Sequence, residues 1–278
     1  MNPRAPHPVR AALPAHAARA FAAILQRELL RFVQQKERFF AALVRPLIWL
    51  LVFAAGFRAT LGLSIIPPYE TYITYDVYVV PGLVGMIQLF NGMQSSLSMV
   101  YDREMGSMRV LMSTPLPRGF LLVARMLSGT FVSIIQAYAF LAIAYALGTD
   151  VPLEGLLPLF PVLILTGMTL SALGTFLSSW IRQLENFAGI MNFVIFPMFF
   201  MSSALYPLWR VREGSVTIYE LCQWNPFTYI VELIRHAMYQ TFEPFSFAVV
   251  AGTLIVFTLA AIIGYTPARG GPAAGRKG

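Results

Sequence analysis

Residues 156–180 have the sequence LLPLFPVLILTGMTLSALGTFLSSW, which contains no charged side chain. A helix of about 20 mainly apolar residues crosses the hydrocarbon core of a bilayer, because the core is roughly 30 Å thick and each residue adds about 1.5 Å. The stretch is long enough and apolar enough to meet this requirement. It therefore predicts a membrane-spanning helix.

The rest of the chain shows the same property. Of the 278 residues, 57% are hydrophobic and 12% are charged, whereas a soluble domain has roughly 25% charged residues. These charges are too few to form a water-facing shell, so most of the surface must face lipid. The fold class predicted is an all-α integral membrane protein with six transmembrane helices, at about 41–61, 78–100, 120–147, 156–180, 187–207 and 245–265.

The basic residues predict the orientation. Cytoplasmic loops carry an excess of Lys and Arg, and most of the 20 such residues lie on one side when the N-terminus is placed in the cytoplasm. Both termini are then cytoplasmic. Residues 1–17 and 267–278 are rich in Pro, Ala, Gly and Arg, which predicts two disordered tails around one domain, 18–266.

Residues 18–40 form an amphipathic pattern. Phe21, Leu25, Leu29 and Phe32 recur at helical spacing, and the charged positions include Arg27, Glu28, Arg31 and Lys36. A basic amphipathic helix lying in the membrane interface fits this pattern. A cytosolic helix packed on another chain fits it equally well.

A second non-spanning helix is predicted at 226–240, on the outer side. Its apolar residues form one stripe, but it is too short to cross and contains Glu232 and Arg235. A re-entrant or interfacial helix beginning near Asn225 and Pro226 would satisfy its backbone internally. Glu232 and Arg235 are three residues apart, so we expect them to pair near the outer surface.

The loop after the second span, YDREMGSMRVLMSTPLP (101–117), combines charged residues with Met and Leu. A short cytoplasmic helix with exposed Met and Leu suits docking into a groove on a partner protein. A plain interhelical turn with a solvated face is the alternative.

Four stretches, in this order, resemble one family. They are YVVPGLVGM (78–86), YDREMGSMRVLMSTPLPRGFLLVARMLSG (101–129), FFMSSALYPL (199–208) and WNPFTYIVELIRHAMYQ (224–240). The series is similar to the membrane subunit of ABC-2 type exporters, which move drugs, lipo-oligosaccharides or polysaccharides. The similarity extends over nearly the whole chain after residue 20.

This resemblance implies a role for each stretch. Residues 101–111 would be the coupling helix that docks on a separate ABC ATPase subunit, which binds ATP and Mg. The coupling residues would be Tyr101, Asp102, Arg103, Glu104, Met105, Gly106, Met108, Arg109 and Leu111. The amphipathic segment would be the interface helix, and 207–240 would contain short re-entrant helices. A homodimer in the bacterial cytoplasmic (inner) membrane is also implied.

Polar residues inside spans are candidates for a translocation path, because unpaired polar groups in lipid are costly. Gln88, Asn91 and Gln94 form a stripe on the second span, and Asn192, Phe196 and Phe199 lie on the fifth. Hydrogen bonding between helices explains the amides equally well, and the Phe-rich fifth span also suits lipid or dimer packing. Pro197 should kink that span.

The sequence contains neither a nucleotide-binding Gly-x-x-x-x-Gly-Lys-Ser/Thr loop nor a catalytic cluster. Its one cysteine and three scattered histidines predict no metal site, and its basic residues do not alternate with aromatic ones as in nucleic-acid-binding proteins. A transport subunit is therefore expected, without an enzymatic site of its own. Two alternatives are a non-transporting membrane scaffold and a lipid-modifying membrane enzyme.

Overall fold

The computed structural model describes residues 13–34, 36–57, 67–69, 73–105, 117–181 and 183–265. Within these ranges every regular element is helical and no β-strand occurs, which confirms the all-α prediction. The elements are α1 (Leu13–Gln34), α2 (Lys36–Phe57), α3 (Tyr75–Glu104), α5 (Arg118–Ala146), the 3-10 helix η1 (Leu153–Gly155), α6 (Leu156–Trp180), α7 (Leu184–Phe200), α8 (Leu208–Gly214), α9 (Val216–Trp224), α10 (Pro226–Met238) and α11 (Pro244–Gly264).

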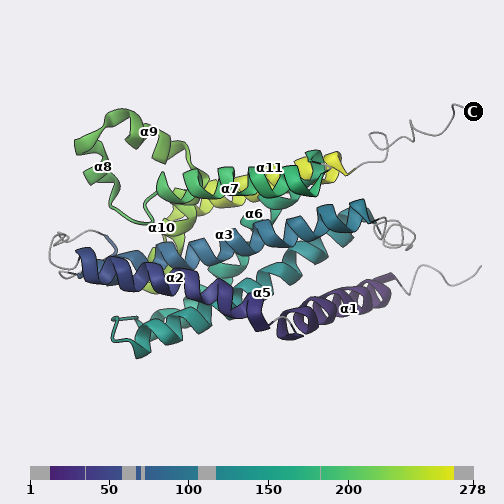
Figure 1. The fold of residues 1–278 in the computed structure, drawn as a ribbon, viewed down its shortest axis with the longest axis horizontal. Coiled ribbons are helices and arrows are strands. Elements are labelled where there is room, and N and C mark those ends of the chain that lie inside the picture. The colour runs from purple at the N-terminus through teal and green to yellow at the C-terminus, as the bar shows by residue number, and fades with distance from the viewer. Residues whose placement is uncertain are drawn as a thin grey trace, which may run out of the picture.

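The helices form an elongated bundle (Figure 1). One end holds α8, α9 and the connection between α5 and α6; we call it the outer end, after the orientation expected from the basic residues. The opposite, inner end holds the last turns of α3 and α11, and α1 lies beside α5 near it. Segments that the charge distribution assigns to one side of the membrane thus lie at one end of the bundle.

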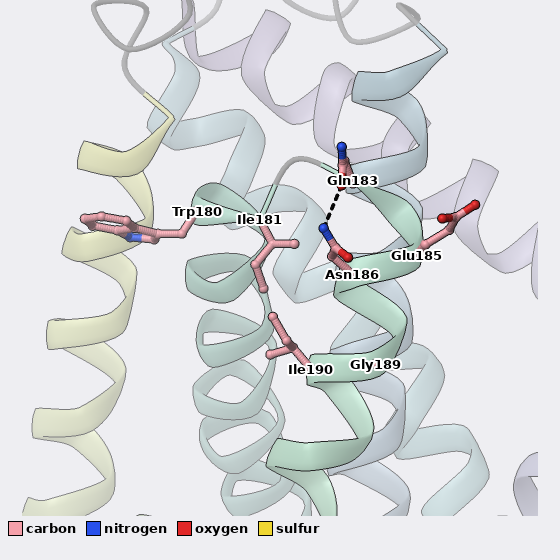
Figure 2. Close-up of a pocket in the computed structure, with 7 residues that line it drawn as sticks. All are labelled: Trp180, Ile181, Gln183, Glu185, Asn186, Gly189 and Ile190. Carbon is pink, nitrogen blue, oxygen red and sulfur yellow. Dashed lines mark hydrogen bonds between the residues drawn. The ribbon is translucent and has the colours of Figure 1, made fainter.

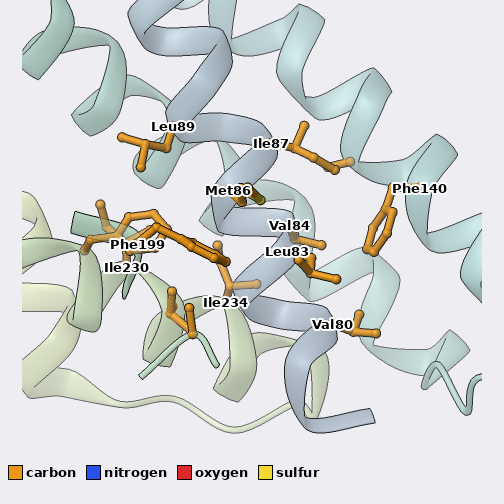
Figure 3. Packing of buried hydrophobic residues seen from close by; sticks show 14 of the residues in the cluster. Val80, Leu83, Val84, Met86, Ile87, Leu89, Phe140, Phe199, Ile230 and Ile234 are labelled. Atoms are coloured by element: carbon orange, nitrogen blue, oxygen red, sulfur yellow. The ribbon is translucent and has the colours of Figure 1, made fainter. Parts of the chain in front are cut away.

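The centre of the bundle is α3, which packs against α2, α5, α6, α7 and α10. Hydrophobic side chains along α3 are buried, with Phe140 of α5 on one side and Phe199, Ile230 and Ile234 on the other (Figure 3). Lipid tails are as apolar as these side chains, so close packing rather than exclusion of water holds such helices together.

Two glycines allow α3 and α6 to approach closely. A Cβ added to Gly92 would lie 2.8 Å from the carbonyl carbon of Leu170, and one added to Gly174 would lie 2.5 Å from the hydroxyl of Ser96. Small residues at a helix crossing let the two backbones approach in this way. The α3–α6 contact therefore depends on positions that have no room for a methyl group.

The predicted spans agree with the helices to different degrees. Residues 156–180 coincide with α6, and three helices of the described chain are long and apolar enough to cross a membrane: Gly119–Ala146, Leu153–Trp180 and Pro244–Gly264. Shorter apolar helices are Ala42–Val52 and Leu184–Phe200. The amides and charged residues of α3 lower its hydropathy, although α3 is the most enclosed helix of the bundle.

The N-terminal helices differ from the expectation. α1 begins at Leu13, so residues 13–17, expected in a disordered tail, are helical. The predicted amphipathic helix 18–40 was wrong at its end, because α1 ends at Gln34 and Lys36 begins α2. Residues 36–44 contain neither Gly nor Pro, so the spanning helix continues into the polar segment before it. Residues 1–12, 58–61 and 266–278 lie outside the described ranges.

The fifth predicted span, 187–207, was too long. α7 ends at Phe200, one turn after Pro197, and residues 201–206 form turns. These turns pack directly on α3, since a Cβ on Gly82 would lie 2.4 Å from the carbonyl oxygen of Ala204. Hydropathy did not reveal this end, because residues 201–206 carry no charge and include Met, Ala and Leu.

The segment between α7 and α11 contains the expected short helices. They are α8, α9 and α10, and α10 follows the predicted 226–240 except that it ends at Met238. α10 packs against α3, α6 and α11, and its apolar stripe is buried. Its depth in a membrane stays a prediction.

Candidate functional site

The predicted coupling segment begins as the last turn of α3. Tyr101–Glu104 continue the helix, and Met105 caps it, so a separate helix starting at residue 101 was wrong. Arg103 and Glu104 are good helix formers, and α3 contains neither Gly nor Pro after Gly92. Tyr101, Glu104 and Met105 are exposed, whereas Gly106, Met108, Arg109 and Leu111 lie outside the described residues.

The other two charged residues of this turn face the bundle. Arg125 of α5 lies 2.9 Å from the carboxylate of Asp102 and donates a 2.7 Å hydrogen bond to the hydroxyl of Ser98. The Arg103 guanidinium lies 4.7 Å from the centre of the Tyr265 ring, within the range of a cation–π contact. The end of α3 is thus bonded to α5 and contacts the end of α11.

Tyr265, which contacts Arg103, is also hydrogen-bonded to α6. The hydroxyls of Tyr265 and Ser178 lie 2.9 Å apart, and both residues are buried. Arg125, Tyr265 and Ser178 were not predicted as members of this site. Their separation from residues 101–105 along the chain left no local pattern from which to predict the contacts.

The predicted interface helix lies against the same region. α1 packs on α5 and α2, and Arg27 pairs with Glu28 at 3.2 Å, where both side chains are partly exposed. Arg31 also lies on α1, but Lys36 belongs to α2. Both interpretations of this helix, in the membrane interface or packed on another chain, stay predictions.

The amides predicted to line a path are engaged between helices. Gln88 donates a 2.7 Å hydrogen bond to the Leu163 carbonyl and accepts one of 2.7 Å from the Thr166 hydroxyl. Asn91 donates to the side-chain oxygen of Gln136 and, at 2.9 Å, to the Ile87 carbonyl. These contacts show the interhelical bonding that was the alternative to a path.

The remaining path candidates do not lie on one common surface. Gln94 is half-buried on α3, and Asn192 and Phe196 are exposed on α7. Phe199 is buried, with its ring 5.9 Å from Trp49 and 6.3 Å from Phe227. Within the chain the structure therefore does not gather the six residues around one channel, and their role in transport stays a prediction.

At the outer end Arg235 is enclosed, being 2% exposed. Its guanidinium lies 2.5 Å from the Glu232 carboxylate, donates a 2.9 Å hydrogen bond to the Ser203 carbonyl and lies 4.3 Å from the centre of the Tyr78 ring. The predicted Glu232–Arg235 pair is confirmed; at the outer end of the bundle Arg235 is buried and Glu232 is partly exposed. α10 packs on α3 and the turns after α7, which cover Arg235.

Asn225 connects the ends of two helices. Its side-chain NH2 donates to the carbonyls of Met198 and Met201, at 2.8 and 2.6 Å, and its side-chain oxygen accepts from the backbone N–H of Phe227 at 3.0 Å. Asn is a favourable residue at the start of a helix, and Pro226 follows at the first helical position. Asn225 therefore caps α10 and satisfies carbonyls at the end of α7.

A cavity of about 650 Å³ opens at the inner end between α6 and α7. Figure 2 shows that its lining side chains diverge: Trp180 points toward α11, whereas Glu185 lies on the opposite side. Asn186 donates a 2.6 Å hydrogen bond to Gln183. The cavity therefore contains no pair of groups arranged for acid–base or nucleophilic chemistry.

No group of three or more His, Cys, Asp or Glu side chains that could hold a metal ion occurs in the described ranges. The functional features of this part of the chain are thus buried ion pairs and interhelical contacts at the two ends of a helical bundle. Such an arrangement is typical of a multi-pass helical membrane protein.

Comparison with known proteins identifies the family. A family model described as ABC-2 type transporter matches residues 19–239, and the chain belongs to this family. It is 26% identical over 220 residues to the ycf38 protein of Porphyra purpurea, whose name provisionally describes a transport permease, covering 77% of this chain and 72% of the relative.

Two further relatives have names that describe a function. YbhR of Escherichia coli (strain K12), named provisionally as a multidrug ABC transporter permease, is 28% identical over 173 residues, or 60% of this chain and 45% of the relative. Nodulation protein J of Rhizobium leguminosarum bv. viciae is 23% identical over 210 residues, or 70% of this chain and 73% of the relative. The chain is accordingly a membrane permease subunit of a transporter, and its family implies an ABC ATPase partner.

Proposed function

We propose that the chain is the permease half of an ATP-driven exporter and that its ATPase partner docks on residues 101–111. The observation that carries the proposal is the end of α3. Tyr101, Glu104 and Met105 are exposed there, while Asp102 in the same turn is bonded to α5. A partner that moves the exposed side chains would therefore also move α3 and α5.

The length of α3 explains how such a movement would reach the other side. Its 30 residues form one continuous helix from Tyr75 to Glu104, which corresponds to about 45 Å at 1.5 Å per residue. ATP and Mg would be bound by the partner, and closure of two ATPase subunits would push on two copies of α3. The cargo would leave at the outer end.

We further propose six membrane spans, with α2, α3 and α7 added to the three long apolar helices. α3 packs against α5 and α6, which are long and apolar enough to span, so we infer that α3 crosses the membrane beside them. α2 and α7 also pack on α3 and would cross with it. Both termini would be cytoplasmic, in the inner membrane of a bacterium. The inner end carries Arg103 and Arg125, in agreement with the excess of basic residues on the cytoplasmic side.

A homodimer would use the exposed face of α7. Asn192 is exposed there beside Phe193 and Phe196, and an amide facing lipid is costly. The outward face of α11 is also exposed but carries Ile255, Val256 and Leu259, which suit lipid. The polar residue thus favours α7 over α11 as the surface that meets a second copy.

The cargo class is the least constrained part of the proposal. The family resemblance and the apolar surroundings of α7 favour an amphiphilic or hydrophobic molecule. The name of the YbhR relative, which refers to multidrug transport, agrees with this class.

The test is a pull-down from native membranes in mild detergent, with mass spectrometry of the copurifying chains. An ATPase subunit should be recovered with the wild-type chain and lost when residues 101–111 are scrambled. Glu104→Arg or Met108→Pro should weaken the coupling of ATP hydrolysis to transport without preventing insertion. Glu213→Arg, an exposed acidic position on α8 at the outer end, is the matched control.

Two outcomes would change the conclusion. Full recovery of the ATPase with the scrambled segment, together with normal transport, would remove the docking role of residues 101–111. An ATPase that copurifies but does not respond to any amphiphile of a test panel would instead support a non-transporting scaffold.

A further inference from the structure

The inference starts from the cluster around Arg235, which joins parts of the chain that are distant in sequence. Glu232 and Arg235 belong to α10, Tyr78 to the first turns of α3 and Ser203 to the turns after α7. The Ser203 carbonyl accepts hydrogen bonds from the Arg235 guanidinium and, at 2.9 Å, from the Tyr78 hydroxyl. One carbonyl thus connects α10, α3 and the turns after α7.

Aromatic residues complete the enclosure. The Tyr69 ring lies 4.7 Å from that of Tyr239, just after α10, and 6.5 Å from that of Tyr78. Tyr75 donates a 2.7 Å hydrogen bond to the Leu205 carbonyl. Polar groups therefore connect the start of α3 to α10 and to the turns after α7.

Stability alone does not require this chemistry. Buried ion pairs are often no more stable than well-packed apolar residues of similar volume, because desolvation of the charges offsets their attraction. Gly82 and Ala204 show that the same helix and turn also pack closely through small residues. A polar connection differs from such packing in one respect: its groups can separate and be hydrated, and can then form the same bonds again.

The partial exposure of the cluster would allow water to enter and its hydrogen bonds to separate. Arg235 is 2% exposed, but its partner Glu232 is 24% exposed, so water reaches the pair from one side. The hydroxyl of Ser203 is buried and has no hydrogen-bond partner among the described residues. It would gain a partner when water enters. The cluster also lies on α3 at the end opposite to Asp102.

We propose that Arg235, with Glu232, Tyr78 and Ser203, forms a latch that closes the outer end of the α3–α10 contact and opens during the transport cycle. The latch rests on the proposed transport function, because its opening would be driven from the inner end of α3. In the closed state the Ser203 carbonyl accepts hydrogen bonds from both Arg235 and Tyr78.

A cysteine reporter tests the latch directly. Cys222 is the single cysteine of the chain, so Ser203→Cys in a Cys222→Ala background places one thiol in the buried cluster. Ser203 is 1% exposed, and a water-soluble maleimide should label this thiol slowly in the purified protein. Arg235→Gln should increase the labelling rate about tenfold, because a minor open state becomes well populated.

Two variants separate a latch from a merely structural contact. Arg210→Gln removes an exposed arginine that pairs with Glu213 on α8 and should leave labelling unchanged. The double variant Arg235→Met, Glu232→Leu should fold, because apolar residues replace the whole ion pair, and should keep the thiol protected even when the ATPase partner and ATP are added.

Failure of the latch and failure of the proposed transport function would give different results. Equal labelling of wild-type and Arg235→Gln proteins, measured without an ATPase, would overturn the latch whatever the chain transports. Faster labelling of Arg235→Gln supports a closing contact. If ATP and the partner then fail to accelerate labelling of the wild-type background, the driven opening is wrong; an absent ATPase partner would instead count against the proposed function.

Discussion

The guanidinium of Arg125 lies 2.9 Å from the carboxylate of Asp102, and this ion pair joins the last turn of α3 to α5. The two side chains are 7% and 13% exposed, so the pair is shielded from water although it lies at the inner end of the bundle. The neighbouring Ser98 hydroxyl accepts a 2.7 Å hydrogen bond from Arg125. This shielded ion pair thus connects the segment proposed to dock the ATPase to α5, and an exposed ion pair would connect them more weakly.

Arg125→Gln should destabilise the protein by about 3–5 kcal/mol, because it leaves the Asp102 carboxylate shielded from water and without its cation. Arg125→Lys keeps the charge but loses the planar guanidinium that reaches both Asp102 and Ser98, so its effect should be smaller. Thermal unfolding of the detergent-solubilised variants measures both. Arg210→Gln is the exposed control, and an Arg125→Gln protein as stable as that control would show that the buried pair contributes little.

Gly92→Ala should separate α3 from α6. The added methyl would lie 2.8–2.9 Å from the backbone of Leu170 and Ser171, and overpacking of this kind costs about 1–3 kcal/mol. Gly252→Ala on α11 is the matched control, because nothing lies within 4 Å of its added Cβ. Gly252→Ala should be neutral or slightly stabilising. Equal unfolding temperatures for the two variants would contradict the close approach at Gly92.

The spans could be predicted because a long uncharged stretch has few alternatives to crossing a membrane. Residues 156–180 gave the bounds of α6 directly. Hydropathy could not find the end of α7, since residues 201–206 carry no charge and continue with Met, Ala and Leu. Asn225, distant in sequence, donates hydrogen bonds to the carbonyls of Met198 and Met201 at that end, and no local pattern predicts this contact.

The site was predictable where its residues are neighbours in sequence. Glu232 and Arg235 lie three residues apart on one helix, and their pairing could be expected from spacing alone. Tyr78 and Ser203, which complete the cluster, are far from them along the chain. Arg125 was one basic residue among several at the cytoplasmic side, and only the packing of α5 against α3 reveals its partner Asp102.

Glu243 should stabilise the start of α11 in a pH-dependent way. Burial alone would raise the pKa of its carboxyl group, but hydrogen bonds from Ser246 and the backbone N–H of Phe245 lower this pKa below its ordinary value. A carboxyl group with a lowered pKa stabilises the folded state above its ordinary pKa, and the effect is lost as the pH falls through the lowered value. The cap should contribute about 1 kcal/mol at neutral pH.

Unfolding temperatures of wild-type and Glu243→Ala proteins should therefore differ at neutral pH and converge in acid. Glu243→Gln retains an oxygen that can accept from Ser246, so it should show a weaker dependence on pH than the wild type. A constant difference between wild type and Glu243→Ala across the acid range would show that the carboxylate charge does not contribute to the cap.

Gln88 and Gln94 provide a test of the translocation path, because the two amides lie on the same helix in different environments. Gln88 is buried and bonded to Leu163 and Thr166 of α6, so Gln88→Leu should reduce stability by roughly 0.6–1.7 kcal/mol, the range of interhelical hydrogen bonds in lipid. Gln94 is half-buried, and Gln94→Leu should change stability less. If the path follows α3, Gln94→Leu should instead alter which amphiphiles stimulate the partner ATPase. A Gln94→Leu protein with wild-type stability and an unchanged response to every amphiphile would remove this residue from the path, and a large loss of stability would make its role one of packing.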